Sequence, residues 1–293
     1  MKDPGFLARF GIKVNESLAS HTRIGAGGNA DFFAVAGDRQ TLGALLDAAA
    51  ANGLPVTVIG CGSRSVCGDH GYRGLVIRYT ANGFQLSEGD VEVDAGYPVH
   101  ELIGRLAEEG RGGFEAFAGY AGSLGGAIAE GASRGTLRFA DVVCRITLAA
   151  GDRSIEVTPA DLKYGEHGAT RLQGGEWILG ARLRAVRREP EEIRRRVVQA
   201  TRDRLRNEPS GKPSVSVFHD PRGHRARDLL TQVGMGGERE GGALVSEKNP
   251  NVIMNDGGAR SRDVYDLSQR MKARVKLRLG VKLTESLAWV GER

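Results

Sequence analysis

Long apolar runs, aromatic residues and paired cysteines are all scarce in this 293-residue chain. No apolar stretch approaches the ~18 residues of a membrane-spanning helix and no signal peptide opens the sequence, so we expect a cytoplasmic protein without a membrane segment. Aromatic residues make up 6% of the chain, which disfavours a nucleic-acid reader that stacks bases. The three cysteines form an odd number without metal-ligand spacing, which indicates a reducing compartment and no metal site.

Glycine, by contrast, is abundant. The chain has 43 glycines, roughly twice the usual fraction, so its backbone is expected to approach other groups closely at many places. The length allows two or three domains with a substantial core. The net charge of +5 is modest and suits an anionic small molecule.

One glycine-rich loop lies between two apolar, β-branched runs. The strands predicted at Val56–Ile59 and Leu75–Ile77 flank Gly60-Cys61-Gly62-Ser63. Glycines let consecutive backbone N–H groups turn toward one anion, and Ser63 can add a hydroxyl donor. The spacing is neither a Gly-x-Gly-x-x-Gly opening a helix nor a P-loop. A phosphate site and a tight turn without ligand both remain open.

The order of the predicted elements indicates an α+β protein. A strand at 32–35 precedes a helix at 39–51 that Asp38 caps and Gly53 closes, and the strand at 56–59 follows, which predicts a parallel βαβ unit. The glycine loop would then lie at the carboxyl end of a strand, where open α/β sheets bind ligands. Further helices are expected at 98–110, 189–207, 224–233 and 261–279, and a last strand at 281–290.

Two later segments have unusual composition. Four glycines in the stretch from Gly119 to Ala127 argue against a helix interior and favour backbone laid against something flat, with close packing of two loops as the alternative. The helix at 189–207 carries many arginines, which we expect to be solvated surface, with Ile193, Val197 and Leu205 facing inward.

Five blocks in order resemble one known family. They are Thr22-Arg23-Ile24-Gly25 with Gly28-Asn29-Ala30-Asp31, Gly60-Cys61-Gly62-Ser63 with Asp69-x-Gly71-Tyr72-x-Gly74, Gly119-x-x-Gly122-Ser123-x-Gly125-Gly126-Ala127, Pro213-Ser214 with Ser216-Val217-Phe218, and Gly241-Gly242-Ala243-x-Val245-Ser246-Glu247-Lys248 with Asn251 and Asn255. From about residue 14 to residue 291 the chain resembles the UDP-N-acetylenolpyruvoylglucosamine reductase (MurB) family, in its shorter, type II form.

The resemblance implies an α+β FAD-binding fold of the vanillyl-alcohol-oxidase/MurB type. It implies two FAD-binding subdomains, at 1–80 and 81–187, and a C-terminal substrate domain at 188–293 whose last strand returns to the FAD domain. In this family NADPH reduces a noncovalent FAD, flavin N5 passes hydride to an enolpyruvyl double bond, and a serine protonates the product. We therefore expect FAD and NADPH, a small-molecule substrate, no nucleic-acid or membrane partner, and a monomer or weak homodimer.

The resemblance also assigns site residues. Expected FAD-binding residues are Gly60, Cys61, Gly62, Ser63, Arg64, Ser65, Gly119, Gly122, Ser123, Gly125, Gly126 and Ala127. Expected substrate-binding residues are Tyr164, Arg171, Phe218, Lys248 and Asn251. Catalytic positions are Ser216, His167 and Ser286, with Glu285 beside the last.

Two of these catalytic positions depart from the family pattern. His167 stands where the family has arginine, so its charge is only partial near neutral pH, and Arg171 is a candidate replacement. Ser286 stands where the family has glutamate, and Glu285 beside it would face the other way on a strand. Three hypotheses remain: a specialised FAD oxidoreductase with an altered substrate, the peptidoglycan reductase with compensating residues, and a flavin-binding protein without turnover.

Overall fold

The computed structural model describes residues 8–87, 89–134, 137–150, 153–165 and 168–292. Contacts group the described residues into two compact units. Of the described residues, unit 1 holds 8–13, 33–61 and 75–204, and unit 2 holds 14–32, 62–74 and 205–292. The three predicted domains stay a prediction.

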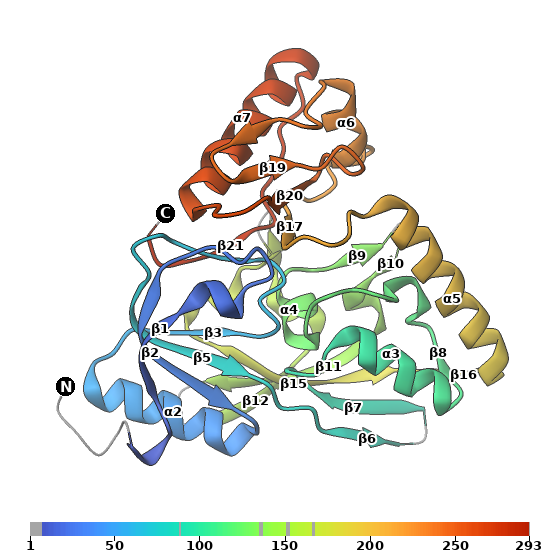
Figure 1. The fold of residues 1–293 in the computed structure, drawn as a ribbon. Helices are drawn as coiled ribbons and strands as arrows, with labels where there is room; N and C mark the ends of the chain where they lie inside the picture. Colours follow the sequence, from blue (N-terminus) through green and yellow to red (C-terminus); the bar gives the residue numbers. More distant parts are fainter. Residues whose placement is uncertain (1–7, 88, 135–136, 151–152, 166–167, 293) are drawn as a thin grey trace. The chain divides into compact units, whose positions relative to one another are not determined.

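Unit 1 is built on a five-stranded antiparallel sheet (Figure 1). Its strands, in spatial order, are β12 (Arg153–Val157), β11 (Val143–Ala150), β15 (Trp177–Arg184), β7 (Asp90–Asp94) and β6 (Phe84–Leu86). Alternation sets the buried face, since Val91 and Val93 are fully buried while Glu92 between them is not. The α+β class predicted from the sequence is confirmed.

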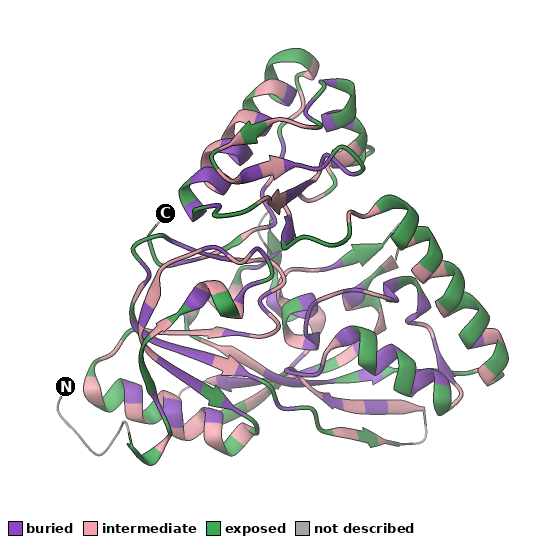
Figure 2. Cartoon of the chain, viewed as in Figure 1, coloured by how far each residue is buried: buried purple, intermediate pink, exposed green. Residues whose placement is uncertain are grey.

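Two helices cover one face of this sheet. The helix α3 (Val99–Glu108) buries Leu102 and Leu106 in the same core as Val91 and Val93, and α4 (Leu124–Ala129) adds Ile128. The helix α5 (Pro190–Asn207) buries Ile193 and is otherwise mostly exposed, as Figure 2 shows. The sequence predicted Leu205 to face inward, which is wrong, because its side chain is 63% exposed.

Local signals in the sequence fix the first helix and strand. In α2 (Arg39–Asn52) the side chain of Asp38 accepts a hydrogen bond from the Thr41 N–H at 2.6 Å, and Gly53 ends the helix with φ 66°. The strand β3 (Val56–Ile59) pairs in parallel with β5 (Tyr72–Tyr79). The sheet order is β1 (Lys13–Ser17), β2 (Asn29–Ala36), β5, β3, so β5 lies between the two strands that α2 connects.

Unit 2 has its own antiparallel sheet and helix pair. The strands β17 (Ser214–Ser216), β20 (Val252–Asn255), β19 (Ala243–Val245) and β18 (Arg239–Glu240) form the sheet, and α6 (Ala226–Gln232) and α7 (Ser261–Leu279) pack on it (Figure 1). Its core also contains Ile24 and Val66 from early in the chain. The strand β4 (Ser65–Cys67) pairs in parallel with β21 (Ala288–Val290).

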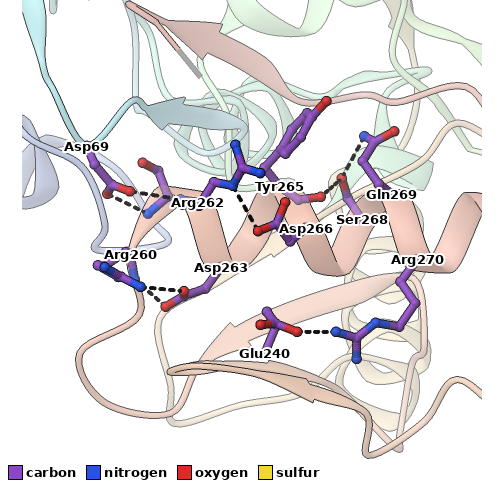
Figure 3. Close-up of polar contacts among 11 residues, drawn as sticks. Asp69, Glu240, Arg260, Arg262, Asp263, Tyr265, Asp266, Ser268, Gln269 and Arg270 are labelled. Atoms are coloured by element: carbon purple, nitrogen blue, oxygen red, sulfur yellow. Dashed lines mark hydrogen bonds and ion pairs between the residues drawn. The ribbon is translucent and has the colours of Figure 1, made fainter.

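The helix α7 receives its N-terminal cap from a residue far away in sequence. The carboxylate of Asp69 accepts hydrogen bonds from the backbone N–H groups of Ser261, at 2.8 Å, and Arg262, at 3.0 Å (Figure 3). These two N–H groups have no partner within the helix, and the positive end of the helix dipole favours a carboxylate. These two hydrogen bonds connect the segment around Asp69, which follows the glycine loop, to the start of α7.

Two sequence predictions fail in detail. The stretch 281–290 was expected to be one strand, but only Ala288–Val290 forms β21. The glycine-rich stretch was expected to be non-helical, yet Gly125 and Gly126 lie inside α4. Tertiary packing outweighs the low helix propensity of glycine there.

Short elements complete the described chain. The paired strands are β8 (Arg111–Gly112) with β16 (Val186–Arg187), β9 (Ser133–Arg134) with β10 (Leu137–Arg138), and β13 (Tyr164–Gly165) with β14 (Gly168–Ala169). The 3₁₀ helices are Leu18–His21, Glu115–Phe117, Phe139–Val142, Pro159–Leu162 and Arg171–Gly174. Among the described helices, none has the length and hydropathy needed to cross a bilayer.

Candidate FAD and substrate site

The glycine loop begins where β3 ends, at a tight contact inside unit 1. A Cβ on Gly60 would overlap the hydroxyl of Ser123 and lie 2.9 Å from its Cβ. Real Cβ atoms do not approach that closely, so only glycine fits here. The first turn of the loop is thus placed directly against the residue that caps α4.

The second half of the loop is fixed inside unit 2. Gly62 has φ 63°, and a Cβ there would overlap the carbonyl oxygen of His21. The Gly62 carbonyl accepts a hydrogen bond from the Arg23 N–H at 2.9 Å. Farther along, Ser65 pairs with Ala288, and the Arg64 carbonyl accepts from the Ala288 N–H at 3.0 Å.

Backbone donors in this loop are available for a ligand. The N–H groups of three successive residues, Cys61, Gly62 and Ser63, donate to no group in the described part of the chain. The same holds, within the described ranges, for the three successive N–H groups of Ala121, Gly122 and Ser123. Free runs of backbone N–H groups are the donor set that binds phosphate oxygens, so both loops fit the diphosphate-bearing cofactor that the sequence predicts.

The second loop is held by packing within unit 1. Ser123 is 3% exposed and accepts a hydrogen bond on its Oγ from the Gly126 N–H at 3.3 Å. A Cβ on Gly125 would lie 2.9 Å from the Cβ of Ala95. Gly125 therefore has a packing role of its own against Ala95, the residue that follows β7, whether or not it also borders a flavin.

The remaining predicted FAD residues of this loop differ in exposure. Gly119 has φ 72° and lies against Arg204, where a Cβ would be 3.1 Å from a guanidinium nitrogen. Gly126 is exposed, Gly122 is buried, and Ala127 is fully buried in the core of unit 1. The side chain of Ala127 thus packs in the core of unit 1. All these assignments stay predictions.

Two cysteines occur in or just after the first loop. Burial raises the pKa of the Cys61 thiol, and burial raises the pKa of the Cys67 thiol to about 12. Because the thiolate is the nucleophile, neither side chain is activated for covalent attachment of a flavin.

The predicted proton donor lies in unit 2 beside the C-terminal segment. Ser216 ends β17, and residues 284–286 run antiparallel to residues 217–219 through an isolated bridge between Phe218 and Glu285. The Ser286 hydroxyl donates to the Ser216 carbonyl at 3.3 Å. The structure thus brings together Ser216 and Ser286, which are 70 residues apart.

The adjacent carboxylate is buried in a different contact set. Glu285 is 7% exposed, and its carboxylate accepts from Gln269 at 2.6 Å and from Trp289 at 3.4 Å. It also pairs with Lys272 at 3.3 Å. Burial acts to raise the pKa of Glu285, but the Gln269 hydrogen bond and the Lys272 charge outweigh burial and lower it. Glu285 is therefore an ionised structural carboxylate.

Predicted substrate residues of unit 1 are also engaged. Arg171 forms a two-pronged pair with Glu176, with N–O distances of 2.7 and 3.1 Å. Tyr164 donates its hydroxyl to the Ile128 carbonyl at 2.9 Å, and burial raises its pKa to about 12. His167 lies outside the described residues. Arg171 is thus already neutralised by a carboxylate of its own.

In unit 2 the predicted substrate residues support the backbone. The Asn251 side chain accepts from the Phe218 N–H at 3.0 Å and donates to the Phe218 carbonyl at 2.9 Å. Phe218 is 3% exposed, within the core. Lys248 is exposed and donates to the Leu205 carbonyl at 2.6 Å. Asn251 therefore positions the strand just after Ser216.

Sequence reasoning missed Lys272, Gln269 and Arg78. Lys272 and Gln269 lie on α7 and hold Glu285 in the segment that follows it, and no local pattern reveals this pairing. Arg78 did carry a signal, since a charge directly follows the apolar run Leu75–Ile77 in a predicted buried strand.

Comparisons with known proteins agree with this geometry. The FAD binding domain family model matches residues 30–157, and the model of the UDP-N-acetylenolpyruvoylglucosamine reductase C-terminal domain matches residues 208–290. The fold and the two loops thus define an FAD-dependent oxidoreductase. 

Relatives cover nearly the whole chain. The UDP-N-acetylenolpyruvoylglucosamine reductase of Geobacter metallireducens is 34% identical over 284 residues, 96% of this chain and 94% of that one. UDP-N-acetylenolpyruvoylglucosamine reductase 2 of Symbiobacterium thermophilum is 34% identical over 97% of this chain and 92% of its own length. The crystal structure of the reductase (MurB) from Thermus caldophilus superposes with a TM-score of 0.81 at 27% identity, over 96% of this chain and 100% of that one. The chain belongs to the UDP-N-acetylenolpyruvoylglucosamine reductase family.

Proposed function

We propose that the protein is a specialised member of this family that uses NADPH and noncovalent FAD to reduce a small unsaturated, anionic substrate other than the peptidoglycan intermediate. The relatives are named for reduction of UDP-N-acetylenolpyruvoylglucosamine. The two glycine loops support retention of their cofactor. The altered catalytic positions support a change of substrate.

One observation carries the change of substrate. The side chain beside Ser216 is the neutral Ser286, and the neighbouring carboxylate of Glu285 is held by Lys272 and Gln269. A carboxylate that helps to stabilise charge in the family reaction therefore has no counterpart at this point of the described structure. The pairing of Arg171 with Glu176 supports the same conclusion, because it occupies the candidate replacement for the family arginine.

The chain's own residues account for proton delivery. Bound FAD supplies hydride chemistry at its N5 atom. We infer that the Ser216 hydroxyl gives a proton to the substrate carbon next to the one that receives hydride. The hydrogen bond from Ser286 to the Ser216 carbonyl holds the end of β17 in place for that step. A serine hydroxyl is a weak acid, so its proton must be replaced during transfer, and His219 or His167 is the candidate for that relay.

Anaerobic half-reactions test the proposal. We expect NADPH to reduce the bound flavin, and UDP-N-acetylenolpyruvoylglucosamine to reoxidise it weakly or not at all. The double variant His167→Arg, Ser286→Glu should raise that reoxidation rate by ~10²–10³, the usual effect of restoring stabilising groups at developing charge. The double variant His167→Arg, Ser286→Gln is the matched control, because glutamine has the size of glutamate without its charge.

Two outcomes would contradict the proposal. If the unmodified protein reoxidised at the rate of an ordinary family member, it would be the peptidoglycan reductase with compensating residues. If NADPH left the bound flavin oxidised, the protein would be a flavin binder without this turnover.

We also propose that the protein acts in the cytoplasm as a monomer or weak homodimer, without a nucleic-acid or membrane partner. The three free cysteines support a reducing compartment. Light scattering during gel filtration, over a hundredfold range of concentration, tests the oligomeric state. A constant dimer mass across that range would contradict it.

A further inference from the structure

A charged side chain lies in unit 1 where the glycine loop leaves the sheet. Arg78 is the penultimate residue of β5, and it lies opposite Ile59, the last residue of β3. Because β3 and β5 are parallel, both strands end at the same edge, and Gly60 and Cys61 continue from that edge. Arg78 is therefore a neighbour of the first turn of the loop.

Arg78 is partly buried, and one buried nitrogen of its guanidinium has no partner in the described chain. Its Nε is buried without a hydrogen-bond acceptor, and its side chain forms no hydrogen bond or ion pair with any residue that the structure describes. Leaving a buried donor of a charged group unpaired is costly, so an anion that is not part of the described chain is the expected partner.

The surroundings of Arg78 favour an anion with several oxygens. Its charge acts on the Cys61 thiol, in the direction that lowers the thiol's pKa, although burial dominates and raises it. The N–H of Cys61 and those of Ala121, Gly122 and Ser123 also donate to nothing described, and Gly60 packs on Ser123. The carboxylate that reaches Cys61 is that of Glu101, which is 59% exposed and so screened by water.

We propose that Arg78 binds the diphosphate of FAD, together with the free N–H groups of Cys61, Ala121, Gly122 and Ser123, which all belong to unit 1. A guanidinium can donate two parallel hydrogen bonds to phosphate oxygens, which backbone N–H groups alone do not supply. The alternative position for a cation in a flavoprotein is beside the isoalloxazine ring. Arg78 lies beside the first residues of the glycine loop, whose free N–H groups suit phosphate oxygens, and this position favours the diphosphate.

Binding of cofactor fragments separates these positions. Flavin is removed reversibly, and the affinity of the protein for FAD, ADP and riboflavin is measured by calorimetry. Arg78→Ala should weaken the binding of FAD and of ADP by about 10–100-fold, the usual contribution of a charge-assisted hydrogen bond. The affinity for riboflavin should stay unchanged. Arg78→Lys should weaken FAD and ADP binding less than Arg78→Ala does, because lysine keeps the charge but lacks the paired donors. Arg182→Ala, at an exposed arginine of β15, removes the same net charge and should change nothing.

Holoenzyme offers a second measurement that does not need flavin removal. The rise in flavin fluorescence on dilution reports cofactor loss, and it should be faster in Arg78→Gln than in the unmodified protein, with a smaller dependence on salt. If Arg78→Ala does not fold, Arg78→Gln decides, since its side chain still fills most of the space. ADP binding unchanged in the folded variant, or a shifted flavin reduction potential with unchanged ADP affinity, would overturn the proposal.

Discussion

The two glycine loops and the pair Ser216 and Ser286 are built in different ways. The loops use backbone N–H groups, and their shape depends on having no side chain at Gly60 and Gly62. The chemistry proposed for the serine pair depends on side chains. The neighbouring carboxylate of Glu285 is bound by Gln269 and Lys272 of α7. A backbone site tolerates sequence change as long as its glycines remain, whereas a side-chain site changes its chemistry with one substitution. This difference explains how a family member can keep its cofactor and change its substrate.

The largest effect is expected where the backbone site has least space. Gly60→Val should abolish flavin retention, because its Cβ would overlap Ser123 and separate the two loops. The ratio of flavin to protein absorbance in the purified variant measures this. Gly104→Ala in α3 is the control, since nothing lies within 4 Å of its Cβ, and it should keep its flavin. A Gly60→Val protein that keeps its full flavin content would contradict the claim that flavin binding depends on the absence of a side chain at this position.

The next largest effect is expected at Ser216, whose side chain is proposed to act only in reoxidation of the flavin. Ser216→Ala should leave flavin reduction by NADPH unchanged and slow reoxidation by the native acceptor by ~10²–10⁴, the usual range for a positioned acid. Stopped-flow measurement of both half-reactions separates the two. Ser214→Ala, on the same strand, is the control variant. Reoxidation at the unmodified rate would remove Ser216 from the mechanism.

A smaller effect is expected at the buried carboxylate of unit 2. Glu285→Gln should lower the free energy of unfolding by about 1–3 kcal/mol, because Lys272 loses its partner in a largely buried contact. The pKa of Glu285 is lowered in the folded protein, so its contribution is complete above the ordinary value of 4.5 and is lost as pH falls through the lower, folded-state value. Denaturant unfolding at pH 7 and at pH 3 checks this, since the variant and the unmodified protein should differ less at pH 3 than at pH 7. An equal difference at both pH values would show that the charge is not the cause.

The smallest effect is expected at the distant cap of α7. Asp69→Ala should cost about 1 kcal/mol of stability, the typical worth of an N-cap, because the N–H groups of Ser261 and Arg262 lose their acceptor. Thermal unfolding measures it, with Asp266→Ala as a control for losing an exposed pair with Arg262. If both variants unfolded at the same temperature, Asp69 would not act as a cap.

Local sequence signals predicted the helices well. Asp38 caps the start of α2 and Gly53 ends it, as predicted, and α7 spans the predicted residues 261–279. The glycine loops could be recognised from the sequence because glycine lacks a Cβ and can adopt positive φ, whatever its tertiary surroundings. The resemblance then connected those loops to FAD, which spacing alone left open.

Features that depend on partners distant in sequence could not be predicted. The strand β21 is short because its partner is the three-residue β4, more than 200 positions earlier. The helix α4 forms because Gly125 packs against Ala95, which propensity does not include. The ion pair between Glu285 and Lys272 joins the C-terminal segment to α7, so the sequence could single out Glu285 but could not show that its carboxylate is already paired.

The assembly of unit 2 from early and late stretches has a consequence for synthesis on the ribosome. Val66 shares a core with residues near the end of the chain, and Ser65 to Cys67 find their strand partner only at Ala288 to Val290. At ~5–20 residues per second, on the order of 10–40 s pass between the emergence of these partners. Residues 62–74 must wait through that interval with their apolar side chains uncovered. Nascent chains are therefore expected to require chaperone protection, and to acquire flavin only after the last residues have left the exit tunnel.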